Sequence, residues 1–147
     1  MDDDEQRAKE ESQRWLARYY QSVVEHYELT GSHLQKTRGY EMYGKLQEKM
    51  HEPGGVAAMN QFFVDLHPWG TPKQVHEKIL EIRRLTGCEG FIGLFSYGGM
   101  PYEIAERNCR RFAAEIKPLL QREVPLAQQQ VASPRRETAG ASLTASA

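Results

Sequence analysis

The sequence lacks the features that would place it in a membrane, on a secretory route or on a nucleic acid. Its longest apolar run, around Phe91 to Phe95, is far shorter than the roughly 20 residues that span a bilayer. The acidic start, Met1 to Glu5, has neither the basic nor the apolar region of a signal peptide. With 19 basic and 20 acidic residues, the net charge of -1 gives no attraction to an anionic partner. These absences predict a cytoplasmic protein with no nucleic-acid and no membrane partner.

Cysteine and histidine are too few or too scattered to form a recognisable centre. The two cysteines, Cys88 and Cys109, form no CxxC pair, which predicts free thiols that pack against their neighbours. The five histidines show no HxH or HExxH spacing. The sequence therefore predicts no metal site.

What the sequence does contain is a series of apolar stripes with helical periodicity. They predict helices over residues 4–28, 40–50, 56–66, 72–86 and 101–120, with a linker at 34–38. The best-marked start is Thr71, whose hydroxyl can cap the helix while Gln74 completes a capping box. Gly87 is placed to end that helix in a left-handed conformation, and Pro118 is expected to kink or end the last one.

One segment, residues 90–95, predicts a strand between two helices. Its sequence, Gly-Phe-Ile-Gly-Leu-Phe, has no polar alternation, which is typical of a strand covered on both faces. Alternation of helix and strand favours an α/β fold. A single strand leaves its backbone groups unpaired. We therefore expect the sheet to be completed from outside these residues, or the chain to be a piece of a larger enzyme.

Several short motifs occur in a fixed order over roughly residues 2–123. They are Asp2-Asp3-Asp4-Glu5, Tyr19-Tyr20, His26-Tyr27-Glu28, Gly39-Tyr40-Glu41, Pro53-Gly54-Gly55-Val56, Trp69-Gly70-Thr71-Pro72, Phe95-Ser96-Tyr97-Gly98-Gly99-Met100-Pro101 and Glu106-Arg107-Asn108. In their order and spacing the chain resembles the C-terminal portion of the bacterial luciferase-like, flavin-dependent monooxygenases. The resemblance implies a (β/α)₈ TIM barrel that binds reduced flavin mononucleotide (FMN) at the C-terminal ends of its strands.

On this resemblance, residues 1–124 are a C-terminal fragment of such a barrel, mostly helical with one clear strand. Residues 30–66 are a helical insertion, and residues 125–147 are a disordered tail because their composition buries too little apolar surface. The active-site histidine and most contacts to the flavin phosphate are implied to lie in an earlier part that is not present. A barrel takes about 250 residues, so the implied partner is the missing barrel portion or a homo-oligomer partner.

The resemblance and the turn chemistry together indicate candidate site residues. The flavin contacts are Trp69, Gly70, Thr71, Ser96, Tyr97, Gly98 and Gly99, and the substrate contacts are Tyr40, Tyr43 and Met100. The paired glycines permit close backbone approach, and Tyr97 offers a ring that can stack, although a plain strand-to-helix turn explains them equally well. For Thr71, helix capping is favoured over anion binding. The aromatic stripe Trp15, Tyr19 and Tyr27 resembles a flavin platform, but its helical spacing favours a packing face.

The helical insertion has two interpretations. Tyr40, Met42 and Tyr43 either cover the substrate pocket as part of a lid that excludes water, or pack as core between two helices. The function implied by the resemblance is an oxidoreductase that uses reduced FMN and oxygen on an organic substrate. Monooxygenation and dehydrogenation both remain open. The alternative is a non-catalytic helical module that pairs with a separate half-barrel or is a degenerate remnant. If the chain is a barrel fragment, the exposed apolar faces of its first and last helices are expected to make it associate.

Overall fold

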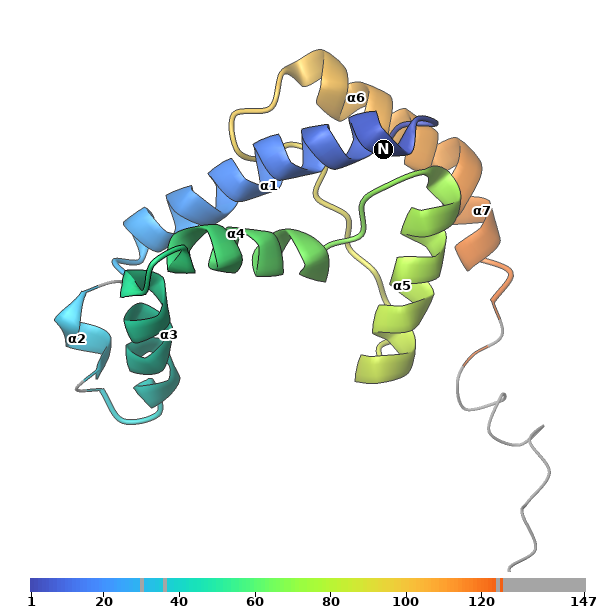
Figure 1. The fold of residues 1–147 in the computed structure, drawn as a ribbon. Helices are drawn as coiled ribbons and strands as arrows, with labels where there is room; N and C mark the ends of the chain where they lie inside the picture. Colours follow the sequence, from blue (N-terminus) through green and yellow to red (C-terminus); the bar gives the residue numbers. More distant parts are fainter. Residues whose placement is uncertain (30, 36, 124, 126–147) are drawn as a thin grey trace, which may run out of the picture.

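The computed structural model describes residues 1–29, 31–35, 37–123 and 125, which form an arch of helices (Figure 1). The elements are α1 (Glu5–His26), α2 (Ser32–Gln35), α3 (Glu41–His51), α4 (Gly55–Leu66), α5 (Pro72–Thr86), α6 (Tyr102–Arg111), the π-helical stretch η1 (Phe112–Ile116) and α7 (Lys117–Leu120). The helices α2 and α3 lie near the C-terminal end of α1, whereas α5 to α7 lie near its N-terminal end (Figure 1). The predicted tail from residue 126 onward lies outside the described residues.

The predicted strand and the barrel fragment built on it are wrong. Among the described residues there is no strand and no sheet, and residues 87–97 are an irregular connection between α5 and α6. The physical reason is that a strand exists only when a second extended backbone lies beside it and exchanges hydrogen bonds with it. The elements around this connection are all helices, so nothing pairs with it. The described fold is all-helical.

The first helix begins within one residue of its predicted start at residue 4. The carboxylate of Asp4 accepts a hydrogen bond from the backbone N–H of Arg7 at 3.0 Å, which caps α1. Farther along, α1 packs against α4, where the ring of Phe63 lies 4.7 Å from that of Tyr20 and 6.0 Å from that of Tyr19, centroid to centroid. The aromatic stripe of α1 is therefore partly a packing face, as the helical spacing predicts.

The helix α5 has the predicted start and end. The hydroxyl of Thr71 accepts from the backbone N–H of Gln74 at 3.4 Å, and the side-chain oxygen of Gln74 accepts from the backbone N–H of Thr71 at 2.9 Å. The chain leaves the helix through Gly87, whose φ of 71° is left-handed. The capping box and the left-handed cap are both confirmed.

The last predicted helix is interrupted near Pro118. Proline has no N–H to donate to the carbonyl one turn earlier, and the backbone widens into the π-helical stretch η1 just before it. Within η1, Ile116 is completely buried and packs against Val75 and Ile79 of α5. This contact holds the C-terminal helices against α5.

The remaining predictions for the helical parts are mixed. The helices expected at 40–50 and 56–66 are present as α3 and α4, but α2 (Ser32–Gln35) overlaps the first residues of the linker expected at 34–38. The thiols of Cys88 and Cys109 are free, as predicted, although both are exposed rather than packed. None of the described helices has the length and apolar character needed to cross a membrane.

Candidate functional site

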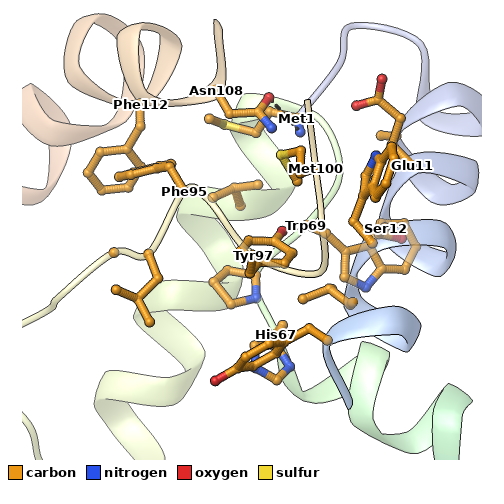
Figure 2. Close-up of a pocket in the computed structure, with 18 of the residues that line it drawn as sticks. Met1, Glu11, Ser12, His67, Trp69, Phe95, Tyr97, Met100, Asn108 and Phe112 are labelled. Carbon is orange, nitrogen blue, oxygen red and sulfur yellow. Dashed lines mark hydrogen bonds between the residues drawn. The ribbon is translucent and has the colours of Figure 1, made fainter. Parts of the chain in front are cut away.

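A pocket of about 310 Å³ lies between α1 and the connection that leads into α6 (Figure 2). Its volume is at the lower end of the ~300–1,000 Å³ typical of small-molecule sites. Most of its wall is apolar and aromatic. The aromatic residues that line it are Trp15, Tyr19, Trp69, Phe91, Phe95, Tyr97 and Phe112. Such a wall suits a flat, largely apolar ring system.

Tyr97 lies near the centre of this pocket, between Met100 and His67 in the view of Figure 2. Its ring centroid is 5.9 Å from that of Tyr19, and the two rings are tilted by 56°. Burial raises the pKa of the Tyr97 phenol, and the negative charge of Glu11 raises it further. The phenol therefore stays protonated around neutral pH and can donate a hydrogen bond. Two of the predicted contacts, Tyr97 and Met100, share this pocket.

The two glycines after Tyr97 have different surroundings. Both are left-handed, with φ of 60° at Gly98 and 72° at Gly99. A Cβ atom at Gly98 would clash with the carbonyl oxygen of Trp15 and lie 3.1 Å from the backbone nitrogen of Tyr19, whereas one at Gly99 would meet open space. The close backbone approach expected of this pair therefore occurs at Gly98, against helix α1. Ser96, just before Tyr97, is exposed.

In the other segment predicted to contact flavin, residues 69–71, only one residue reaches the pocket. Trp69 lines the pocket, but Gly70 and Thr71 are not among its lining residues. The backbone N–H and hydroxyl of Thr71 are engaged with Gln74 in the capping box. The capping interpretation is therefore confirmed for Thr71, and of this segment only Trp69 reaches the pocket.

Few polar groups face the pocket, and they differ in how they are satisfied. Glu11 accepts a hydrogen bond from Arg107 at 2.8 Å, and the hydroxyl of Ser12 donates to the carbonyl of Lys9 at 2.8 Å. Trp15 also lines the pocket, but its indole Nε1 is fully buried and has no hydrogen-bond partner among the described residues, so this N–H does not face the pocket.

The candidate lid residues lie elsewhere. The rings of Tyr40 and Tyr43 stack on each other, with centroids 5.6 Å apart and planes 29° apart, and neither residue lines the pocket. Met42 beside them is 70% exposed. Figure 1 shows α3 near the opposite end of the arch from α5. The described structure does not bring the predicted substrate contacts Tyr40 and Tyr43 together with Met100.

Sequence reasoning did not select several residues that line the pocket as site residues. Trp15 and Tyr19 were assigned to packing by their helical spacing, and both do pack, yet each also lines the pocket. Phe91 and Phe95 were assigned to a covered strand. The available signal was the aromatic excess of the first helix, but nothing in the sequence says that this helix meets the turn at Gly98.

Within the ranges that the structure describes, no group of three or more histidine, cysteine, aspartate or glutamate side chains is placed to hold a metal ion. Comparison of the chain with protein-family models, with curated proteins and with solved structures finds no match.

Proposed function

We propose that this chain supplies one wall of the flavin and substrate pocket of a flavin-dependent oxidoreductase of the luciferase-like class. The observation that carries the proposal is the meeting of Trp69, Tyr97 and Met100 in one aromatic pocket. These residues come from two separate motifs of the resemblance. The motif order along residues 2–123 supports the same class.

The residues in the pocket fit the ring system of a flavin better than its phosphate. An isoalloxazine ring is flat and apolar on its faces and has carbonyl and nitrogen acceptors at its edge. The aromatic wall suits the faces, and the protonated phenol of Tyr97 suits an edge acceptor. No lysine or arginine lines the pocket, and Glu11 would repel a phosphate. The phosphate is therefore expected to be held by groups outside the described residues.

When bound, reduced FMN would supply the electrons for reaction with oxygen and, in the monooxygenase form, for transfer of one oxygen atom to an organic substrate. The residues described here would bind and shield the ring. Tyr97 would donate a hydrogen bond from a phenol that stays protonated, and the aromatic wall would exclude water. Met100, which is 9% exposed and packs against Trp15, would border the substrate side.

The test is an anaerobic titration of the full chain with reduced FMN and, separately, with reduced lumiflavin, which has the ring but no phosphate. Calorimetry gives the affinity, and the two tryptophans report the site because both line the pocket. We expect saturable binding of one molecule per chain, with similar affinity for both ligands. Absence of saturable binding would contradict the proposal, and a large preference for FMN would contradict the ring-only assignment.

A matched pair of variants localises the binding. Tyr97→Phe removes a hydroxyl in the pocket, and Tyr40→Phe removes the same group from a residue outside it. We expect the first to weaken lumiflavin binding by roughly fivefold to tenfold, the worth of one neutral hydrogen bond of about 1 kcal/mol. The second is expected to leave the affinity unchanged. Equal effects of both variants would place the ligand elsewhere.

A further inference from the structure

The connection between α5 and α6 carries an apolar surface that no described residue covers. Exposure alternates along it, with Gly93 and Phe95 partly buried and Ile92 and Leu94 exposed by 89% and 72%. An alternation of period two is the geometry of an extended strand. Its inner face is packed, because the ring of Phe95 lies 5.3 Å from that of Phe112. Its outer residues, Ile92 and Leu94, are apolar and exposed, and they also border the pocket.

The backbone of the same segment is also unpaired. No backbone hydrogen bond joins residues 90–96 to any other residue that the structure describes. A row of free N–H and C=O groups on an extended segment is a template for a second extended backbone. A helix or a small molecule cannot satisfy such a row. The chemistry of the missing partner is therefore that of an extended, apolar polypeptide.

The segment is complementary to itself. The residues Phe91-Ile92-Gly93-Leu94-Phe95 are symmetric about Gly93 in size and polarity. In an antiparallel pair centred on this glycine, Ile92 lies beside Leu94 of the second copy. Residues 90–96 include no charged side chain, so the pairing opposes no like charges. Gly93 at the centre presents no side chain, which lets the two backbones approach closely.

We propose that residues 90–96 are a self-association surface, on which two copies of the chain pair as antiparallel strands about a two-fold axis at Gly93. Such an interface is isologous, as in most homodimers. The net charge of -1 opposes it only weakly. A two-stranded pair alone is marginal in water, so the dimer is expected to dissociate on dilution. Residues 91–95 also line the pocket, so the two proposals share residues, but self-association does not require a bound flavin.

The test is sedimentation velocity of the full chain over a wide range of concentration, without flavin, together with amide hydrogen exchange. We expect the mass to rise from 16.9 kDa toward twice that value as concentration increases. The amides of residues 90–96 are expected to become protected in the same range. A chain that stays monomeric, or a dimer with these amides unprotected, would overturn the proposal. Because no flavin is present, failure of the chain to dimerise is distinguishable from failure of the chain to bind flavin.

Two variants, each of which replaces an exposed leucine with lysine, locate the interface. Leu94→Lys alters the proposed surface, and Leu85→Lys alters a comparably exposed leucine on α5, 78% against 72% exposed. We expect Leu94→Lys to weaken the dimer by about tenfold or more, since it places a charge in an apolar strand pair, a cost of about 1.4 kcal/mol. Leu85→Lys is expected to leave the dimer unchanged. A dimer that both variants weaken equally overturns the proposal.

Discussion

Two glycine-containing segments lead into helices of this protein, and they have different physical roles. Before α5, residues 69–71 form a local structure in which Thr71 and Gln74 exchange two hydrogen bonds. Before α6, residues 96–101 depend on a distant helix, because Gly98 lies directly against the backbone of Trp15. The first segment begins a helix, whereas the second also places Tyr97 in the pocket.

The difference shows which parts of a site can be placed by local chemistry. A capping box needs only residues within one helical turn, so its geometry follows from the sequence. A close approach between a turn and a helix depends on how the whole chain packs. The proposed flavin site belongs mainly to the second segment, with Trp69 as the contribution of the first.

The largest expected effect is a difference in stability between alanine substitutions at Gly98 and at Gly99. Gly98→Ala is expected to lower the free energy of unfolding by about 1–3 kcal/mol more than Gly99→Ala, because only the first methyl group meets the backbone of α1. Both variants carry the cost of a left-handed alanine, about 1–2 kcal/mol. Urea unfolding measures both values. Equal losses would mean that the second segment does not depend on its contact with α1.

A smaller effect is expected at the first segment. Thr71→Ala is expected to lower the free energy of unfolding by about 1 kcal/mol through loss of the cap, and Thr71→Ser to lower it far less because the hydroxyl is kept. Neither variant is expected to change lumiflavin affinity. If Thr71→Ala weakens lumiflavin binding while the chain remains folded, the first segment also binds the ligand and the comparison fails.

The smallest effect concerns the pH dependence of stability. Burial raises the pKa of Tyr97 in the folded chain above its ordinary value of 10.0. Above pH 10 the folded state therefore binds more protons than the unfolded state. The free energy of unfolding is unaffected by this group below pH 10 and falls as the pH rises further. Tyr97→Phe is expected to make the alkaline fall of the urea midpoint shallower. Tyr20, whose pKa burial also raises, accounts for part of the remaining fall. An unchanged slope would contradict the burial of Tyr97.

The sequence predicts local features of this fold well and tertiary ones poorly. The caps at Thr71 and Gly87 were predicted, because each is decided by residues within a turn or two. The strand at residues 90–95 was predicted wrongly, because an apolar pattern shows that a segment needs cover but does not supply a partner. Within this segment the exposed side chains of Ile92 and Leu94 still alternate with a partly buried residue, as they would in a strand.

The candidate site was predictable to a similar degree. Trp69, Tyr97 and Met100 were selected from their motifs and do meet in one pocket. Tyr40 and Tyr43 were selected from the length of an insertion, and they stack on each other away from it. The contribution of Trp15 was missed because helical spacing explains an aromatic stripe without saying what else it touches.

The proposed flavin pocket is tested most directly by amide hydrogen exchange of the full chain with and without reduced lumiflavin, measured at the segments that lead into α5 and α6. We expect added protection at residues 97–100 and at the part of α1 that Gly98 contacts. We expect none at Thr71 and Gln74, whose backbone N–H groups are bonded within the cap. Protection confined to Thr71 and Gln74, or absent from both segments under saturating ligand, would contradict the proposed flavin pocket.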